Sequence, residues 1–498
     1  MKSVNLKLNK DFTIGTTDKR IFGSFIEHLG RGIYGGLYEP EHPLADEDGF
    51  RTDVIELVKE IDVPVVRYPG GNFVSGYDWT DGIGPKESRP RTLELAWNTT
   101  ETNQFGTDEF AKWVKKANTQ AMMAVNLGTK GIDDARHIVE YCNHKSGTYW
   151  SDLRRKNGCE EPHNFKLWCL GNEMDGAWQM GHMDAHDYGL KANSAARAMK
   201  MVDPDIETVL CGSSGKGMKT FGTWETETLD ICYDAVDYLS LHTYIGNGEN
   251  NLENFLAKSI DMETFIKDVV STVDYVKAKR RSKKIINLSF DEWNVWYHSS
   301  GAKFEKWCEA PHILEDKYDF ADVLAVGLML NVLIRNCDRV KIGCMAQLVN
   351  VIAPIMTENG GKAYRQTTFY PYKFASHYGR GRVLNTVAKS TKHDTKDFTD
   401  VDDIDTVAVL SEDEEYITIF AINRAVDEEG LLSAELQNFS DYLPAEHIAI
   451  SGYDTAQINT AECETVRPHN EKTPIIDGNS LVANLKPLSW NCIRLKRI

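Results

Sequence analysis

Residues 164–173 read NFKLWCLGNE, an apolar run that ends abruptly in Asn172 and Glu173. A run of this length and composition is typical of a strand buried in the interior of a sheet. Polar groups that follow such a strand lie at its carboxyl end, where the loops of βα folds gather and their chemistry takes place. The stretch therefore predicts a buried parallel strand that brings an amide and a carboxylate to a functional edge.

Seven further apolar runs share this character, and longer amphipathic segments separate them. The expected strands are residues 21–29, 63–70, 121–128, 164–173, 207–214, 236–244, 285–293 and 340–350. The expected helices include residues 52–61, 107–117, 187–202 and 320–336. Eight doubly buried strands that alternate with helices favour an α/β fold of the closed (β/α)8 type, a TIM barrel. The rival nucleotide-binding sheet has little support, because no GxxxxGKS or GxxxxGKT motif occurs anywhere in the chain.

The chain changes texture after residue 375. Short alternating runs such as YITIFAINR (416–424) and HIAISGYD (447–454) are separated by polar turns and show little helical periodicity. Such a tail predicts an all-β sandwich. The N-terminal run SVNLKL (3–8) alternates in the same way, so we expect it to join the C-terminal sheet. The predicted domains are a barrel over 14–375 and a β-sandwich built from 1–13 plus 376–498.

Composition limits the possible partners. The chain has 498 residues, 42% of them hydrophobic, and a formal net charge of −18. Nucleic acid and anionic membrane surfaces are therefore not expected partners, since both require clustered Lys and Arg. The N-terminus lacks the apolar core of a signal peptide, and no stretch approaches membrane-spanning length, so we expect a cytoplasmic protein. The ten cysteines follow neither zinc-ligand nor disulfide-scaffold spacing and are expected to be buried reduced thiols.

Polar residues follow most of the expected barrel strands, and two strands end in a Glu. Glu173 follows the fourth strand and Glu292 the seventh. Glycoside hydrolysis requires such a pair: one carboxylic acid protonates the leaving oxygen, and the other attacks the anomeric carbon or activates water. Their separation would decide the stereochemistry, about 5 to 5.5 Å for retention and roughly 6.5 to 9.5 Å for inversion.

Aromatic residues in or beside the same loops support a carbohydrate site, because sugar rings stack on aromatic faces. Core packing is the competing interpretation for each of them. Trp296, just beyond Glu292, is the one that core packing explains least well. The residues concerned are Tyr77, Trp97, Trp178, Tyr244, Trp293 and Trp296.

Four long motifs resemble those of the α-L-arabinofuranosidases of glycoside hydrolase family 51, of the intracellular bacterial type, and occur in the family's order. They are GSFIEHLGRGIYGG (23–36), VVRYPGGNFVSGYDW (65–79), GNEMDGAWQMGH (171–182) and SFDEWNVWY (289–297). The resemblance implies a (β/α)8 barrel with a jelly-roll-like β-domain, a retaining double displacement without a metal or other cofactor, and often a hexamer. One departure is Ala177, where the motif usually has Pro, which puts leaving-group specificity in doubt more than the reaction.

Carried over by position, the resemblance implies roles for eight residues. Glu173 would be the general acid/base and Glu292 the nucleophile. Asn172 would bind the hydroxyl beside the reacting carbon, and Trp296 would shape substrate recognition. The other residues implied to hold the furanose hydroxyls are Glu27, Asn72, Tyr244 and Gln347.

The expected activity is an exo-acting release of terminal arabinofuranosyl residues from arabinoxylan- or arabinan-derived oligosaccharides. One alternative is a β-xylosidase or endoglucanase on the same barrel, since the same carboxylate pair would serve. Another is a carbohydrate-binding protein without turnover, although such a protein has no need of an acid and a nucleophile. His182 and His186, four residues apart, could also bind a metal, but no third ligand is evident.

Overall fold

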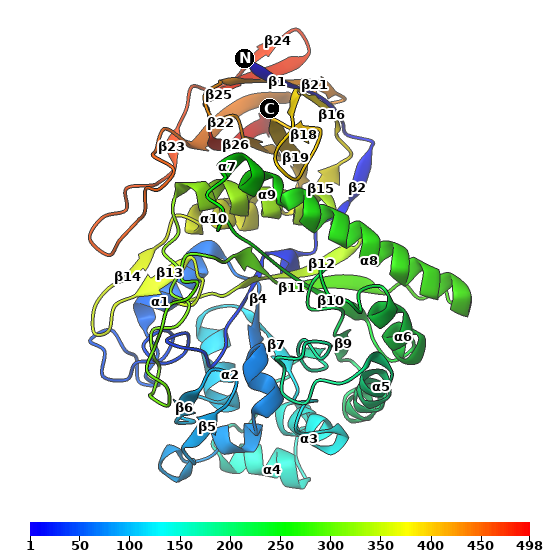
Figure 1. The fold of residues 1–498 in the computed structure, drawn as a ribbon, viewed down its shortest axis with the longest axis vertical. Coiled ribbons are helices and arrows are strands. Elements are labelled where there is room, and N and C mark those ends of the chain that lie inside the picture. Colours follow the sequence, from blue (N-terminus) through cyan, green and yellow to red (C-terminus); the bar gives the residue numbers. More distant parts are fainter.

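Eight parallel strands close into a barrel in the computed structural model, which describes residues 1–498 (Figure 1). Each expected apolar run overlaps one of these strands, so the barrel prediction is confirmed. In chain order the strands are β3 (Gly23–Phe25), β4 (Val65–Tyr68), β7 (Gln120–Ala124), β8 (Leu167–Cys169), β9 (Glu207–Leu210), β10 (Tyr238–Ile245), β11 (Asn287–Val295) and β12 (Val340–Ala346).

Helices connect the strands, as the alternation predicted. α9 is buried along almost its whole length because it lies between the barrel and the C-terminal sheets (Figure 1), which explains why its sequence is apolar on every side. The helices are α1 (Thr52–Ile61), α2 (Thr107–Lys116), α3 (Ile132–Asn143), α4 (Tyr149–Lys156), α5 (Ala185–Val202), α6 (Thr223–Cys232), α7 (Leu252–Ala257), α8 (Ser259–Arg280), α9 (Phe320–Arg335) and α10 (Phe369–Tyr378). No helix combines the length and the apolar character that crossing a membrane requires.

Two further sheets form a sandwich at one end of the molecule, and both chain termini lie in it (Figure 1). One sheet has the order β16 (Val387–Ser390), β1 (Lys2–Asn9), β21 (Gly430–Gln437), β25 (Ser480–Leu485) and β24 (Ile475–Asp477). The other has the order β2 (Thr13–Thr16), β15 (Gly381–Leu384), β19 (Ile404–Ser411), β20 (Tyr416–Asn423), β26 (Ser489–Arg497), β22 (Tyr442–Ile450) and β23 (His469–Asn470).

The N-terminal strand belongs to this sandwich. β1 pairs in parallel with β21 and antiparallel with β16, which confirms that the run SVNLKL joins the C-terminal sheet. β2 also pairs with β15, so the chain leaves the sandwich only after Thr16, slightly beyond the predicted boundary at residue 13. Short hairpins outside these sheets are β5–β6 (Thr92–Glu94, Thr99–Glu101), β13–β14 (Ile355–Thr357, Ala363–Arg365) and β17–β18 (Lys392–His393, Val401–Asp402).

The sandwich and the barrel share a packed boundary. A separate core of 20 buried residues fills the space between the two sheets. On the outer face of the larger sheet, Trp490 belongs to the main barrel core. Gly327 of α9 allows this close approach, because a Cβ there would lie 2.5 Å from Trp490 Cδ1.

The cysteines are all free thiols, as expected, but not all are buried. Cys463 is exposed, and Cys159 and Cys308 are partly exposed. The remaining seven are buried in the interior, where a thiol packs as a small apolar group.

Candidate active site

A cavity of about 440 Å³ opens at the carboxyl ends of the barrel strands. Strands and the loops that follow them supply its walls, which is the usual location of the active site in this fold. Every predicted site residue except Asn172 lines the cavity. These residues are Glu27, Asn72, Glu173, Tyr244, Glu292, Trp296 and Gln347.

The two candidate catalytic carboxylates face each other across this cavity. Glu173 lies just after β8 and Glu292 within β11. One carboxylate oxygen of Glu173 lies within 4.8 Å of one of Glu292. This separation fits the roughly 5 to 5.5 Å of a retaining glycosidase and leaves too little room for the water that an inverting one places between its carboxylates.

Both oxygens of Glu292 are held by neighbouring side chains. Arg67 Nη1 donates to Oε1 at 2.7 Å, and the Tyr244 hydroxyl donates to Oε2 at 2.8 Å. Arg67 also donates from Nη2 to Asn172 Oδ1 at 2.6 Å. A buried guanidinium in this fork geometry fixes the orientation of the carboxylate and the amide together.

Asn172 does not line the cavity and is only 1% exposed. Its Nδ2 is 3.4 Å from Gln179 Oε1, a long contact that a substrate hydroxyl could compete for.

Glu173 is held in an unusual backbone conformation. Its φ of +45° lies in the left-handed region that non-glycine residues rarely adopt, and strain of this kind concentrates at functional sites. The indole of Trp178 donates to Glu173 Oε2 at 2.7 Å. His242 Nδ1 lies 2.9 Å from Glu173 Oε1 and 3.6 Å from Glu292 Oε2.

His242 therefore sits between the two glutamates. Burial alone would lower the pKa of His242, but the charge of Glu292 and the contacts with Asp291 and Glu173 raise it to about 10. At neutral pH the ring carries a positive charge between two acidic groups.

Glu27 lies on the cavity floor and accepts three hydrogen bonds. The donors are the backbone N–H of Phe73 at 2.8 Å, the Trp97 indole at 2.9 Å and Gln347 Nε2 at 3.2 Å. Burial raises the pKa of Glu27 to about 8 despite the bonds from Phe73 and Trp97, and the charge of Glu292 adds to the effect.

The two glycines of the PGGN motif make room for this floor. Gly70 has a φ of +142°, and a Cβ there would lie 2.2 Å from Glu27 Cγ. A Cβ on Gly71 would lie 3.1 Å from Glu292 Oε1. Only glycine allows the backbone to pass this close to Glu27 at position 70, whereas a Cβ at position 71 would require the Glu292 carboxylate to shift slightly.

Four of the six aromatic candidates line the cavity, namely Trp97, Trp178, Tyr244 and Trp296. Trp178 and Trp296 are 55% and 40% exposed, which leaves their rings free for a ligand. The expectation was wrong for Trp293 and Tyr77. Trp293 is fully buried, because it follows Glu292 in β11 and points to the opposite face of the strand. Tyr77 packs against Phe73 and His28 instead.

Other polar residues at the ends of the barrel strands form hydrogen bonds to the surrounding loops and do not line the cavity. His28 contacts Glu101 and Tyr68, and Asn126 Nδ2 donates to the backbone carbonyl of Tyr77. The metal alternative for His182 and His186 loses support, since His186 Nδ1 lies 3.4 Å from Glu227 and His182 Nδ1 lies 3.2 Å from the carbonyl of Gln179.

Sequence reasoning missed one wall of the cavity and two positioning roles. Leu314 and Ile352 line the wall from loops, with φ values of +52° and +38°, and no periodic pattern marks such positions. Sequence reasoning assigned no role to Arg67 in β4 or to His242 in β10. Their position at carboxyl ends beside the two glutamates was the signal that could have assigned them a role.

Two protein-family models match most of the chain. The Alpha-L-arabinofuranosidase 1 domain matches residues 57–253, and the Alpha-L-arabinofuranosidase C-terminal domain matches residues 291–489. The chain is 57% identical over 499 residues to the intracellular exo-α-(1→5)-L-arabinofuranosidase 1 of Bacillus subtilis, covering 100% of both proteins. It is 55% identical to a protein of the same activity name from Acetivibrio thermocellus, covering 99% of this chain and 100% of that one.

Solved structures agree with these matches. A family 51 α-L-arabinofuranosidase from Bifidobacterium longum superposes with a TM-score of 0.95 at 43% identity, covering 99% of each chain. The arabinose complex of the Thermotoga maritima α-L-arabinofuranosidase gives a TM-score of 0.89 at 32% identity, covering 99% of this chain and 100% of that one. Together with the carboxylate pair at the barrel mouth, these similarities show that the chain belongs to the α-L-arabinofuranosidases of glycoside hydrolase family 51.

Proposed function

We propose that the chain removes terminal arabinofuranosyl residues from α-(1→5)-linked, arabinan-derived oligosaccharides by a retaining double displacement. The observation that carries the proposal is the approach of Glu173 and Glu292 within 4.8 Å in one cavity. The linkage rests on the names of the Bacillus, Acetivibrio and Halalkalibacterium relatives, which are 55–57% identical to this chain. A more distant Bifidobacterium relative, at 44% identity, is named for the (1→6) linkage.

In the first step Glu292 attacks the anomeric carbon of the terminal arabinofuranose. The glycosidic C–O bond breaks as Glu173 gives its proton to the leaving oxygen, and an arabinofuranosyl ester forms on Glu292. In the second step Glu173 takes a proton from water as the water attacks the same carbon. The ester bond breaks, arabinose leaves, and Glu173 is protonated again.

Arg67 and Tyr244 position Glu292 for this attack, since each donates to one of its oxygens. The positive charge on His242 lies beside both glutamates and favours the negative charge that each carries at some stage of the cycle. Arg67 also orients Asn172 toward the hydroxyl beside the reacting carbon, where a contact strengthens in the transition state.

Substrate recognition is proposed to rest on the remaining cavity residues. Glu27, Asn72 and Gln347 offer carboxyl and amide groups to the furanose hydroxyls. Trp296 and Trp178 offer exposed rings on which the neighbouring sugar can stack.

We further propose that the protein acts in the cytoplasm on short imported oligosaccharides, because the relatives at 55–57% identity are named intracellular. A homo-oligomer, a hexamer by resemblance to the family, is proposed as its solution state. Light scattering coupled to size-exclusion chromatography tests this directly, and a monomer of 56.3 kDa would contradict it.

The test of the proposed function is a set of initial rates on p-nitrophenyl glycosides: α-L-arabinofuranoside, α-L-arabinopyranoside, β-D-xyloside and β-D-glucoside. We expect strong preference for the furanoside, and a loss of roughly three orders of magnitude or more in Glu292→Ala. Glu56→Ala, an exposed Glu on α1, is the matched control and should keep full activity. Turnover of only the xyloside or glucoside would overturn the specificity, and binding without hydrolysis would favour the carbohydrate-binding alternative.

Natural linkage preference needs a second panel. Arabinose release from (1→5)-linked arabino-oligosaccharides should exceed release from (1→6)-linked and xylan-derived ones when products are separated by chromatography. Preference for an arabinoxylan-derived substrate would leave the mechanism intact but contradict the proposed source of the substrate.

A further inference from the structure

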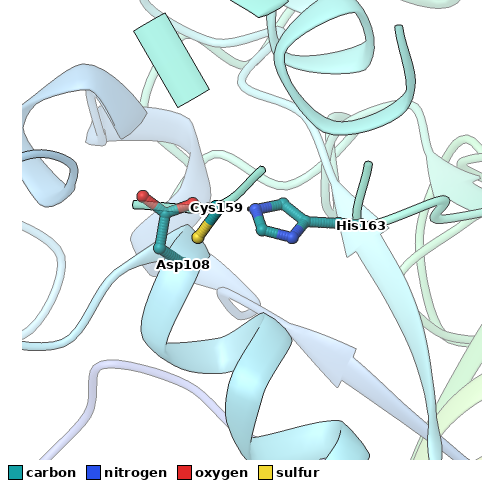
Figure 2. Close-up of side chains that lie close together, drawn as sticks. All are labelled: Asp108, Cys159 and His163. Atoms are coloured by element: carbon teal, nitrogen blue, oxygen red, sulfur yellow. Dashed lines mark hydrogen bonds and ion pairs between the residues drawn. The ribbon is translucent and has the colours of Figure 1, made fainter. Parts of the chain in front are cut away.

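Three side chains with metal-binding atoms gather outside the catalytic cavity (Figure 2). Asp108 lies in the first turn of α2, and Cys159 and His163 lie in the connection from α4 to β8. One donor atom from each residue lies within 4.8 Å of the others, and His163 Nε2 is 2.8 Å from Asp108 Oδ1. None of the three lines the cavity that holds Glu173 and Glu292.

We propose that Asp108, Cys159 and His163 bind a divalent transition metal of the zinc type. A carboxylate oxygen, a thiolate sulfur and an imidazole nitrogen are the ligands that zinc prefers, and three of them leave a fourth tetrahedral position for water. A sulfur and a nitrogen donor select against magnesium and calcium, which take oxygen ligands.

The chain geometry suits this arrangement. Cys159 and His163 are separated by three residues of one short loop, so both can approach an ion from the same side, while Asp108 approaches from a helix. The cysteine pattern along the sequence hid the site, because its third member lies 51 positions upstream of Cys159 (159 − 108).

Neighbouring groups already hold these ligands in place. The Tyr141 hydroxyl donates to Asp108 Oδ2 at 2.7 Å and in turn accepts from Asn157 Nδ2 at 3.1 Å. The backbone N–H of His163 donates to the carbonyl of Cys142 at 2.7 Å. Outer contacts of this kind orient metal ligands and are a regular part of metal sites.

An ion pair between Asp108 and His163 is the competing explanation. It accounts for their 2.8 Å contact but not for the thiol beside them. Burial and the Asp108 carboxylate raise the pKa of the Cys159 thiol to about 12, so without a cation the sulfur stays a neutral thiol beside the pair. Metal binding reverses this: the S–H bond breaks, a sulfur–metal bond forms, and the proton passes to solvent.

The location of the cluster determines how an ion could reach it and what its binding would do to the protein. The His163 and Asp108 side chains are 3% and 9% exposed, whereas Cys159 is only partly buried and leaves a path from solvent. A bound ion would tie α2 to the segment that enters β8. Because the unfolded chain does not hold these three groups together, binding would stabilise the fold and not the chemistry.

The experiment uses the full-length protein, stripped of metal with a chelator and then titrated with Zn²⁺ and Co²⁺. Calorimetry should give one equivalent of Zn²⁺ bound per chain, with proton release, and the Tm should rise by a few degrees. Co²⁺ should show the charge-transfer absorption of a cobalt–thiolate bond. Zn²⁺ binding, the rise in Tm and the Co²⁺ band should all disappear in Cys159→Ser and in the isosteric Asp108→Asn, and persist in Cys463→Ser, which removes an exposed thiol.

Other results would overturn the proposal. Absence of stoichiometric binding, or a thiolate band that survives Cys159→Ser, would assign the cluster to packing alone. Binding without a thiolate band but with loss of turnover would place the ion at Glu173, His242 and Glu292, whose donor atoms also lie close together. If Cys159→Ser fails to fold, Asp108→Asn decides the question, since it keeps the shape of the side chain.

Discussion

The ionisation of Glu27 in the folded site differs strongly from that of a carboxyl group in water. Its three hydrogen-bond donors favour the carboxylate, but burial at 2% exposure outweighs them and raises its pKa to about 8. At neutral pH the group is therefore mostly protonated on the cavity floor, where it adds no second full charge beside Glu292.

This shift predicts a pH dependence of stability. Between the ordinary value near 4.5 and about 8, the folded protein holds a proton on Glu27 that the unfolded chain has lost. The free energy of unfolding therefore falls as pH rises through this window, on the order of a few kcal/mol in total. Glu27→Gln removes this titration while keeping an oxygen for Phe73 and Trp97.

Urea unfolding of both proteins from pH 5 to pH 9 measures the effect. The stability of Glu27→Gln relative to the wild type should increase as pH rises to about 8 and level off above it. Glu56→Gln, at an exposed site on α1, should show no such trend. Parallel curves for Glu27→Gln and the wild type would contradict the raised pKa.

At the scale of single residues, the sequence predicted which side chains lie at the mouth of the barrel, because this depends on which residues end the strands. Glu27, Glu173 and Glu292 could be placed at one mouth because the carboxyl ends of parallel strands converge there. The direction of a single side chain could not, as Trp293 shows, since one residue along a strand reverses the face. The positions of Leu314 and Ile352 depend on left-handed loop conformations that leave no periodic signal.

Among the elements, the turn after β4 shows how backbone shape makes the site. Gly70 passes so close to Glu27 that an alanine would both occupy forbidden backbone space and collide with that side chain. We expect Gly70→Ala to displace Glu27, lower kcat/KM by roughly 100-fold and cost about 2 to 4 kcal/mol of stability.

Gly147→Ala provides the matched control. Gly147 also has a positive φ, +89°, but a Cβ there would meet nothing within 4 Å. It should therefore show the backbone cost alone and keep its activity. Equal effects of the two substitutions on kcat/KM would show that the contact with Glu27 does not matter.

The sequence predicted which segments form helices and which form strands, and their order along the chain. It did not predict the residues at which the strands end. The run 164–173 yields only the three residues of β8, because Gly171 and Glu173 adopt left-handed conformations that turn the chain out of the sheet. α1 matches its expected residues 52–61, since a clear 3.6-residue pattern defines both its face and its length.

At the scale of the whole molecule, the N-terminal strand β1 packs within the sandwich that the C-terminal part of the chain forms. β1 buries Val4, Leu6 and Leu8 in the core between the sandwich sheets and turns Asn5 and Lys7 outward. The alternation of this strand was visible in the sequence. Its parallel pairing with β21 was not, because partner choice is a tertiary property.

We predict that Leu6→Ala lowers the free energy of unfolding by about 2 to 4 kcal/mol, through lost burial and the cavity left behind. Lys7→Ala, on the outer face of the same strand, should change it by less than about 0.5 kcal/mol. Urea unfolding followed by circular dichroism distinguishes them. Equal midpoints would mean that β1 is dispensable to the sandwich.

The division into a barrel over 14–375 and a sandwich from 1–13 plus 376–498 stays a prediction. The packing of α9 against the sandwich through Gly327 and Trp490 indicates that neither part is independent of the other. Two parts that share a buried boundary are expected to stabilise one another.

The most direct test of the mechanism is to trap its intermediate. In Glu173→Ala, a furanoside with a good leaving group should still react with Glu292, but no base remains to activate water, so the arabinofuranosyl-enzyme should accumulate. Intact mass and peptide mapping should place one pentosyl group on Glu292, and azide should release it as arabinofuranosyl azide. A mutant that is equally slow on every leaving group, or that carries the adduct on another residue, would contradict the assignment of the two glutamates.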